Sequence, residues 1–246
     1  MHAIMLAAGR GIRLSNGAGH PKCLLEFGGH TLLRRHIAIL ESLGIDKLTI
    51  VAGFKAEEIH AELAAIGAKP WIDTIHNPRF EEGAVVSLWA ARDVLRGGSD
   101  ILFMDADVLY DRAVLQRLTQ SPHRNCLLID RDLEPGPEPV KACLRGGQLV
   151  EFGKIVSGDF EAMGEWPGFL KLEPLMAGRL AAATERFVAN GRAAEPYEPA
   201  MREVFFADPT HRIGCEDITG MAWIEIDTPE DLRRAHQAIE PALGIG

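Results

Sequence analysis

The stretch that decides the fold is LAAGRGIRL at residues 6–14, with the dipeptide PK following at 21–22. Its small residues, at positions 7, 8, 9 and 11, allow a phosphate group to approach the backbone N–H groups closely. The arginines Arg10 and Arg13 add cationic donors, and Lys22 adds a third directly after Pro21, which restricts the backbone. Together these features predict a loop that binds the triphosphate of a nucleotide.

Two other phosphate-binding loops fit this stretch less well. A Rossmann fingerprint needs G-x-G-x-x-G running directly into a helix, but Leu14 stands at the third glycine position and residues 15–20 do not read as a first helical turn. A P-loop needs G-K-S or G-K-T, which the stretch lacks. The remaining alternative is a glycine-rich turn with surface arginines, and the added Pro21-Lys22 argues against it.

Outward from the loop, short apolar runs alternate with amphipathic stretches through the first half of the chain. The predicted strands are 3–7, 47–52, 71–76, 101–104 and 125–129, and the predicted helices are 31–43, 55–66, 83–95 and 111–119. Strands that are apolar on both faces and separated by helices are typical of a mostly parallel sheet flanked by helices. The predicted fold class is therefore α/β.

The pattern changes after Asp130. Prolines and a glycine predict a loop over 131–139. The other predicted elements are a hairpin of 140–144 and 149–152, a strand 169–172, helices 174–190 and 199–206, a hairpin of 214–218 and 222–226, and a closing helix from the N-cap Thr228. Because no linker is evident, we predict one domain over 1–246, with a nucleotide-binding half (1–130) and an α+β acceptor-binding half (131–246).

Two carboxylates, Asp105 and Asp107, follow the apolar run 101–104, and a second acidic pair, Glu225 and Asp227, follows another apolar run. In open α/β sheets ligands collect at the carboxyl ends of the strands. Mg²⁺ commonly takes one or two protein carboxylates and fills its shell with water and phosphate oxygens. A surface turn explains D-x-D alone equally well, and Asp227 could instead cap the helix after it.

Composition narrows the possible partners. The chain has 26 Lys and Arg against 35 Asp and Glu, a formal charge of −9. A non-specific binder of nucleic acid presents a basic surface, so we expect no nucleic-acid partner. The N-terminus reads as a strand rather than a signal peptide, and no apolar run approaches the roughly 20 residues that span a bilayer. We expect a cytoplasmic protein without a membrane partner; its oligomeric state does not follow from the sequence.

The segments LAAGRGIRL and PKCLL, at 6–14 and 21–25, resemble the signature of the nucleotidyltransferases that activate sugar 1-phosphates and phosphocholine. The resemblance implies a nucleotide-diphospho-sugar transferase (GT-A-like) fold, an NTP substrate and Mg²⁺ held by Asp107 and Asp227. It implies catalytic roles for Lys22, Arg13 and Asp107. The implied nucleotide-binding residues are Leu6, Ala7, Ala8, Gly9, Arg10, Gly11, Arg13, Lys22, Ser87 and Asp105. Ile12 and Glu26 depart from the pattern, since many relatives carry Thr or Ser at the first position and the sugar enzymes usually carry Pro at the second.

Further segments resemble the choline-phosphate cytidylyltransferase branch of this family. Ser87 lies in a segment that borders the base there, although it could equally bond to its own helix backbone. Lys154, in VEFGK at 150–154, matches a lysine that contacts the acceptor phosphate. Aromatic faces with nearby carboxylates would suit a quaternary ammonium group. The predicted acceptor-binding residues are Lys154, Trp166, Tyr197, Glu216 and Trp223.

These features predict a nucleotidyltransferase that couples an NTP, in first place CTP, to a small phosphorylated acceptor such as phosphocholine. A 2-aminoethylphosphonate cytidylyltransferase and a sugar-1-phosphate nucleotidylyltransferase are the alternatives within the same chemistry. A glycosyltransferase also uses D-x-D and a metal ion, but it would lack the loop 9–22. A regulatory module that binds nucleotide without turnover would be expected to have lost Lys22 or the carboxylates.

Overall fold

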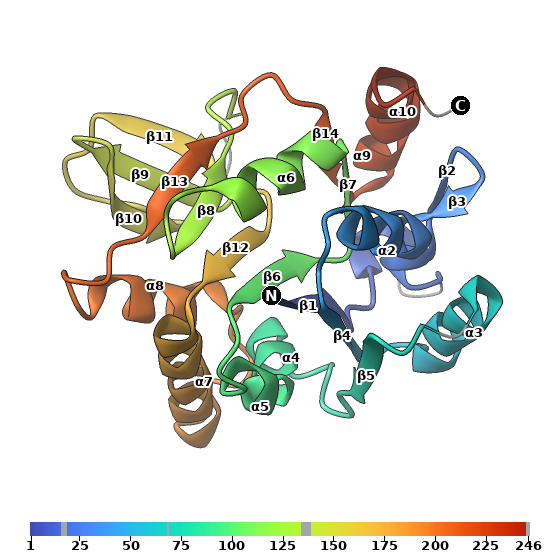
Figure 1. Ribbon diagram of the computed structural model, residues 1–246, viewed down its shortest axis with the longest axis horizontal. Coiled ribbons are helices and arrows are strands. Elements are labelled where there is room, and N and C mark those ends of the chain that lie inside the picture. The colour runs from blue at the N-terminus through green and yellow to red at the C-terminus, as the bar shows by residue number, and fades with distance from the viewer. Residues whose placement is uncertain (16–18, 68, 134–138, 245–246) are drawn as a thin grey trace.

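The computed structural model describes residues 1–15, 19–67, 69–133 and 139–244, so residues 16–18 of the predicted phosphate loop and 134–138 of the predicted loop 131–139 lie outside the described residues. Its centre is a seven-stranded sheet in the order β13-β8-β12-β6-β1-β4-β5 (Figure 1). The strands are β1 (His2–Ala7), β4 (Lys47–Ala52), β5 (Ile72–His76), β6 (Ile101–Asp105), β8 (Cys126–Ile129), β12 (Phe169–Leu172) and β13 (Gly214–Asp217). The strand β12 runs antiparallel to β6 and β8, and the other pairs are parallel. This confirms the mostly parallel sheet, and strands from both halves of the chain share it.

Alternate residues of the central strands enter two different cores. Ile4 and Phe103 pack on one face of the sheet, whereas Met5 and Met104 pack on the other. This follows from the period of two in a strand, and it explains why these strands are apolar throughout. The first face is covered by α4 (Ala84–Ala90), α5 (Arg92–Leu95), α7 (Pro174–Ala189) and α8 (Glu198–Phe206), and the second by α2 (Leu32–Ser42), α3 (Ala56–Ile66) and α6 (Arg112–Gln120).

Side-chain caps fix where several helices begin. Thr31 caps α2 by accepting a hydrogen bond from the backbone N–H of Arg34 (3.1 Å), and Asp111 caps α6 in the same way. Thr228 caps α9 (Pro229–Arg234) in a capping box with Asp231, so the closing helix starts where the sequence predicts. The chain continues through η2 (Ala235–Ile239) and α10 (Glu240–Ala242). The predicted helix 83–95 is instead two helices, because the N–H of Ala91 bonds three residues back to Leu88 and tightens the turn.

The hairpin predicted for 214–218 and 222–226 is wrong. The first segment forms β13 and lies parallel to β8 in the central sheet, whereas the second forms β14 (Trp223–Glu225) and pairs antiparallel with β7 (Val108–Tyr110). The turn between them docks on the segment that follows β8, where Thr219 accepts a hydrogen bond from the N–H of Arg131. Each of the two strands therefore pairs with a strand from the first half of the chain, and the two do not pair with each other.

The smaller elements complete the fold. The predicted hairpin at 140–152 is confirmed as β9 (Lys141–Arg145) and β10 (Gln148–Gly153), with Gly146 and Gly147 both at positive φ in the turn. The unpredicted β11 (Ala162–Glu165) extends it into a three-stranded sheet. The remaining elements are α1 (Ile12–Ser15), η1 (Lys22–Leu24), β2 (Glu26–Phe27) and β3 (His30–Thr31). Over the described ranges, the structure has no helix with the length and apolarity to cross a membrane.

Candidate active site

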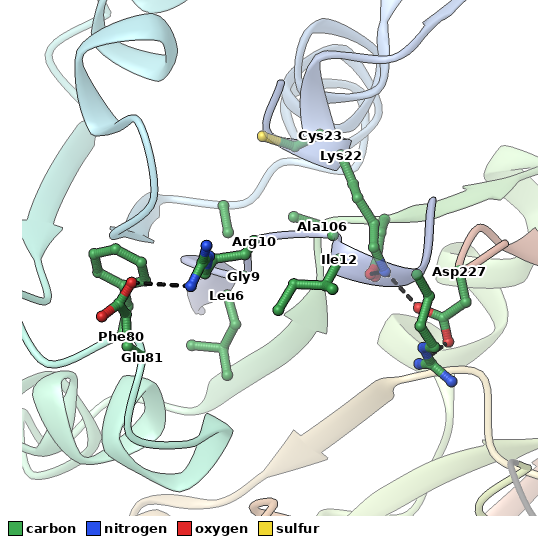
Figure 2. Close-up of a pocket in the computed structure, with 14 residues that line it drawn as sticks. Leu6, Gly9, Arg10, Ile12, Lys22, Cys23, Phe80, Glu81, Ala106 and Asp227 are labelled. Atoms are coloured by element: carbon green, nitrogen blue, oxygen red, sulfur yellow. Dashed lines mark hydrogen bonds and ion pairs between the residues drawn. The ribbon is translucent and has the colours of Figure 1, made fainter. Parts of the chain in front are cut away.

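The glycine-rich loop begins where β1 ends, at the carboxyl edge of the central sheet between β4 and β6. It forms one wall of a cavity of about 340 Å³ (Figure 2). Its lining comes from the loop, the segment after β5, the D-x-D turn and the C-terminal part of the chain. The lining residues are Leu6, Ala7, Gly9, Arg10, Gly11, Ile12, Arg13, Lys22, Cys23, Phe80, Glu81, Ala106, Asp107 and Asp227. The edge at which ligands collect in open α/β sheets is thus the edge that carries the loop.

Gly11 allows Lys22 to cross the loop. Its φ is +58°, a conformation that favours glycine, and a Cβ added there would lie 3.1 Å from Cγ of Lys22. Pro21 is buried at the start of η1, which orients the lysine towards the cavity. A side chain at position 11 would therefore push the lysine away.

Lys22 lies between two carboxylates that are far apart in the sequence. Its Nζ donates to Oδ2 of Asp107 at 2.8 Å and also to Asp227, and Arg13 donates to Oδ2 of the same Asp227 at 2.6 Å (Figure 2). Burial alone would lower the pKa of Lys22, but the charges of the two carboxylates outweigh it and raise the pKa above its ordinary value. Burial would raise the pKa of Asp227, but the charge of Lys22 holds it below its ordinary value. The ammonium group is therefore firmly protonated, between two anions.

The pairing of β14 with β7 brings these carboxylates together. Glu225 lies opposite Val108 in the register, and the N–H of Ile226 donates to the backbone oxygen of Asp107 at 3.0 Å. One carboxylate oxygen each from Asp107, Glu225 and Asp227 lies within 4.8 Å of the others, and burial together with the neighbouring Asp107 raises the pKa of Glu225. In the sequence, Glu225 stands out as part of a second acidic pair, but the metal ligands that the resemblance implies are Asp107 and Asp227. The spacing of two between Glu225 and Asp227 was the available signal, because residues i and i+2 share one face of an extended segment.

A buried histidine supports the D-x-D turn from behind. His36 of α2 is 1% exposed; its Nε2 lies 3.1 Å from the backbone oxygen of Ala106 and its Nδ1 lies 3.2 Å from the hydroxyl of Tyr110. A carbonyl oxygen can only accept, so Nε2 carries the proton and Nδ1 accepts from Tyr110. This chain of hydrogen bonds fixes the backbone beside Asp107.

The buried His36 predicts that the protein loses stability in mild acid. Burial lowers its pKa from 6.5 to about 4, so the unfolded chain binds the proton more readily than the folded protein. The neutral His36 makes its full contribution to the free energy of unfolding above pH 6.5. That contribution is lost as the pH falls towards 4, which lowers the free energy of unfolding by roughly 3 kcal/mol. We expect the free energy of unfolding, measured by urea titration at pH 7 and pH 4.5, to fall less in His36→Gln than in wild type. His123→Gln, at an exposed histidine, should keep the wild-type pH dependence. The prediction would be contradicted if the free energy of unfolding of His36→Gln fell as much between pH 7 and pH 4.5 as that of wild type.

The opposite end of the cavity carries the predicted Arg10 together with Phe80 and Glu81, which were not predicted from the sequence. Arg10 reaches away from Lys22 and pairs with Glu81 at 3.1 Å, next to Phe80 (Figure 2). Phe80 packs so closely on Gly53 that a Cβ there would lie 2.6 Å from it. The tight packing of this loop against β4 could not be read from the sequence, because it depends on side chains distant in the chain.

A second cavity, of about 470 Å³, adjoins the first, and Arg13 and Asp227 line both. Four of the five residues predicted to bind the acceptor line it: Lys154, Trp166, Tyr197 and Trp223. Glu216 lies on β13 and does not line it. Their role in binding stays a prediction.

Three residues predicted to bind nucleotide lie outside the first cavity. Ala8 is buried beneath the loop, and Asp105 faces the second cavity, where it accepts a hydrogen bond from the hydroxyl of Tyr197 at 2.5 Å. Ser87 is buried in α4 and accepts a hydrogen bond from Asn77 at 3.1 Å, and its role in nucleotide binding stays a prediction. Sequence position alone does not distinguish the two sides of the D-x-D turn, because the direction of each side chain depends on the strand before it.

Comparison with known protein families gives a match of residues 3–155 to the MobA-like NTP transferase domain. Among curated proteins, the chain is 27% identical over 251 residues to the CMP-5'-(3-aminopropyl)phosphonate synthase of Streptomyces rubellomurinus, covering 98% of this chain and 39% of that protein. It is also 27% identical over 241 residues to the bifunctional IPC transferase and DIPP synthase of Rubrobacter xylanophilus, covering 96% of this chain and 51% of that protein. Other homologues are cytidylyltransferases for phosphoglutamine and choline phosphate.

Solved structures show the same fold. The inositol-1-phosphate CTP transferase from T. maritima superposes with a TM-score of 0.76 at 18% identity, covering 100% of this chain and 96% of that one. The chain spans between 39% and 53% of the length of three curated relatives that it matches. The similarity therefore covers the two cavities but not the whole of those proteins.

Proposed function

Because this chain belongs to the MobA-like NTP transferase family, we propose that it is a cytidylyltransferase that transfers the CMP group of CTP to a small acceptor carrying a phosphate or phosphonate. The family confirms the nucleotidyltransferase resemblance that residues 6–25 carry. CTP is proposed over other nucleotides because cytidylyl transfer or CMP appears in the names of several relatives.

The observation that carries this proposal is the position of Lys22, Arg13 and Asp227 where the two cavities meet. A triphosphate in the first cavity would extend along the small residues of the loop and end beside Lys22 and Arg13. An acceptor in the second cavity would approach the same point from the other side, past Lys154. The two substrates would then meet at the cationic groups, which is the arrangement that group transfer between them requires.

The chemistry needs positioning and charge neutralisation rather than a covalent nucleophile. An oxygen of the acceptor phosphate or phosphonate attacks the α-phosphorus of CTP and forms a new P–O bond. The bond between that phosphorus and the α,β-bridging oxygen breaks, and pyrophosphate leaves with the electron pair. Lys22 and Arg13 would donate hydrogen bonds to the phosphoryl oxygens on which charge develops.

The three carboxylates Asp107, Glu225 and Asp227 fit a hard divalent cation such as Mg²⁺. Their oxygens lie close together, and the negative charges of Asp107 and Asp227 raise the pKa of Glu225. A cation between the three carboxylates would relieve this repulsion. Mg²⁺, when bound, would supply Lewis-acid polarisation and neutralise phosphate charge. In the structure Lys22 supplies the positive charge between Asp107 and Asp227.

A pyrophosphate-release screen tests the proposal. It crosses four NTPs with phosphocholine, 2-aminoethylphosphonate and several sugar 1-phosphates in the presence of Mg²⁺. We expect release with CTP and a small amine-bearing acceptor. Release with UTP or dTTP and a sugar phosphate, but none with CTP, would overturn the proposed substrates, and no release under any pairing would favour a nucleotide-binding module without turnover.

A further inference from the structure

The second cavity carries far more negative than positive charge. Its lining has eight carboxylates against three cationic side chains: Asp105, Asp130, Asp132, Glu165, Glu198, Glu225, Asp227 and Asp231 against Arg13, Lys154 and Arg234. An acceptor that carried only a phosphate would be repelled by this wall. A bound Mg²⁺ would offset part of this excess at Glu225 and Asp227, and a positive charge on the acceptor would offset more of it.

Several of these carboxylates already have partners within the protein. Asp130 accepts a hydrogen bond from Nε1 of Trp223 at 2.7 Å, and Asp231 caps α9. Asp105 accepts from Tyr197, and Asp227 pairs with Arg13. Each of these groups has a structural or proposed catalytic reason to be there, so none of them by itself points to a bound cation.

Glu198 differs from them. It lies in the first turn of α8, is 7% exposed and lines the second cavity, yet its Oε2 has no hydrogen-bond partner among the described residues. Burial raises the pKa of Glu198, and the charge of Lys154 opposes this only in part. A buried carboxylate oxygen without a partner is costly, on the order of 1–3 kcal/mol or more, and such atoms are rare in folded proteins. A ligand that donates a hydrogen bond to it would remove that cost.

Of the three aromatic residues that line this cavity, Trp166 and Tyr197 pack against other rings, whereas the partly buried Trp223 donates a hydrogen bond to Asp130. Trp166 is 3% exposed, stacks on Phe103 at a centroid distance of 6.0 Å and meets Phe152 edge-on at 5.3 Å. Tyr197 meets Phe103 edge-on at 5.2 Å. A quaternary ammonium needs open aromatic faces around it. A primary ammonium needs hydrogen-bond acceptors, which is what Glu198 provides.

We propose that Glu198 determines acceptor specificity and that the acceptor carries a primary ammonium group, which donates a hydrogen bond to Oε2 of Glu198. This inference rests on the proposed cytidylyltransferase function and narrows its acceptor to short aminoalkyl phosphates or phosphonates. The phosphate or phosphonate lies towards Arg13, and the ammonium lies beside Glu198 at the start of α8, while the charge of Lys154 acts on both Asp227 and Glu198. Phosphocholine, which has no N–H to donate, leaves Oε2 of Glu198 without a partner.

The test compares phosphoethanolamine with phosphocholine, which differ only in three N-methyl groups. With CTP and Mg²⁺, we expect kcat/KM from pyrophosphate release to be roughly 100-fold higher for phosphoethanolamine, as expected when a buried polar group is left unpaired by the wrong substrate. Glu198→Gln should lower kcat/KM for phosphoethanolamine by roughly the same factor, mainly through its KM, and leave the KM for CTP unchanged. Glu203→Gln, at an exposed position of the same helix, is the matched control and should behave as wild type.

The outcomes separate this inference from the proposed function. Equal or faster turnover of phosphocholine by the wild-type protein would overturn the inference and leave cytidylyl transfer intact. Turnover of a sugar phosphate, which carries no positive charge, and of no other acceptor would do the same. A Glu198→Gln variant that loses both acceptors equally would overturn the role of Glu198. Absence of release with every acceptor would instead remove the proposed function. If Glu198→Gln fails to fold, the comparison of the two acceptors on the wild-type protein still decides the inference.

Discussion

Replacement of Lys22 by alanine is expected to lower kcat for pyrophosphate release by about a thousandfold or more, while the protein stays folded. The ammonium group lies where the two cavities meet, and its protonated form is stabilised by Asp107 and Asp227. A charged donor at a phosphoryl group is commonly worth about 10²–10⁵ in rate, because it acts in a site from which water is largely excluded. Steady-state kinetics with CTP and the acceptor identified in the screen measure the effect. Near-normal turnover would contradict the assignment of Lys22 as a catalytic residue.

The same variant has a second expected property, which does not depend on turnover. Without Lys22, the carboxylates of Asp107, Glu225 and Asp227 face one another with Arg13 and the charge of Lys154 at Asp227 to balance them. We expect Lys22→Ala to unfold at a lower temperature than wild type in EDTA, and to bind Mn²⁺ at least about tenfold more tightly, because the ammonium no longer competes for the carboxylates. Added Mg²⁺ should restore its melting temperature. Lys69→Ala, which removes a surface pair with Glu41, is the control and should change neither property.

The sequence was sufficient to predict most of the strands and helices of residues 1–130 because their signals are local. The loop after β1 reads as a phosphate site from small residues and cations within one short stretch, and apolar runs mark the strands around it. Asp107 follows directly from its position after β6. These predictions need no knowledge of which distant segments meet.

The sequence was insufficient wherever the site depends on pairing between distant segments. The pairing of β14 with β7 places Glu225 beside Asp107, and the wrong hairpin at 214–226 hid that pairing. Phe80 reaches the first cavity only because of its packing on Gly53. Glu198 was not among the residues predicted from the sequence, and only its burial identifies its oxygen as unpaired. In each case the missing information is a contact between residues that are distant in the chain.

The second large effect is expected from Asp107→Asn, which should abolish turnover to the same extent as chelation of divalent ions by EDTA. An asparagine keeps the shape of the side chain but removes the charge that holds a hard cation, so we expect a loss of about a thousandfold or more in kcat and a matching loss of Mn²⁺ binding. Asp73→Asn, at an exposed aspartate paired with Lys47, is the matched control. Retention of Mn²⁺ affinity in Asp107→Asn would contradict the assignment of this residue as a metal ligand.

Asp107→Asn should also differ from Lys22→Ala in its effect on stability, although both variants lose activity. Burial is the largest cause of the raised pKa values of Asp105 and Glu225, and the charge of Asp107 is the next largest. The Asp107 carboxylate therefore destabilises these two neighbours in the absence of a cation. Its removal relieves that repulsion, whereas Asp227 still holds Lys22 and Arg13. We therefore expect Asp107→Asn to melt in EDTA at the same temperature as wild type or higher, where Lys22→Ala melts lower. Such opposite shifts are expected of a site whose carboxylates are kept for function at a cost in stability. A fall in melting temperature in both variants would mean that Asp107 and Lys22 act mainly as a structural ion pair.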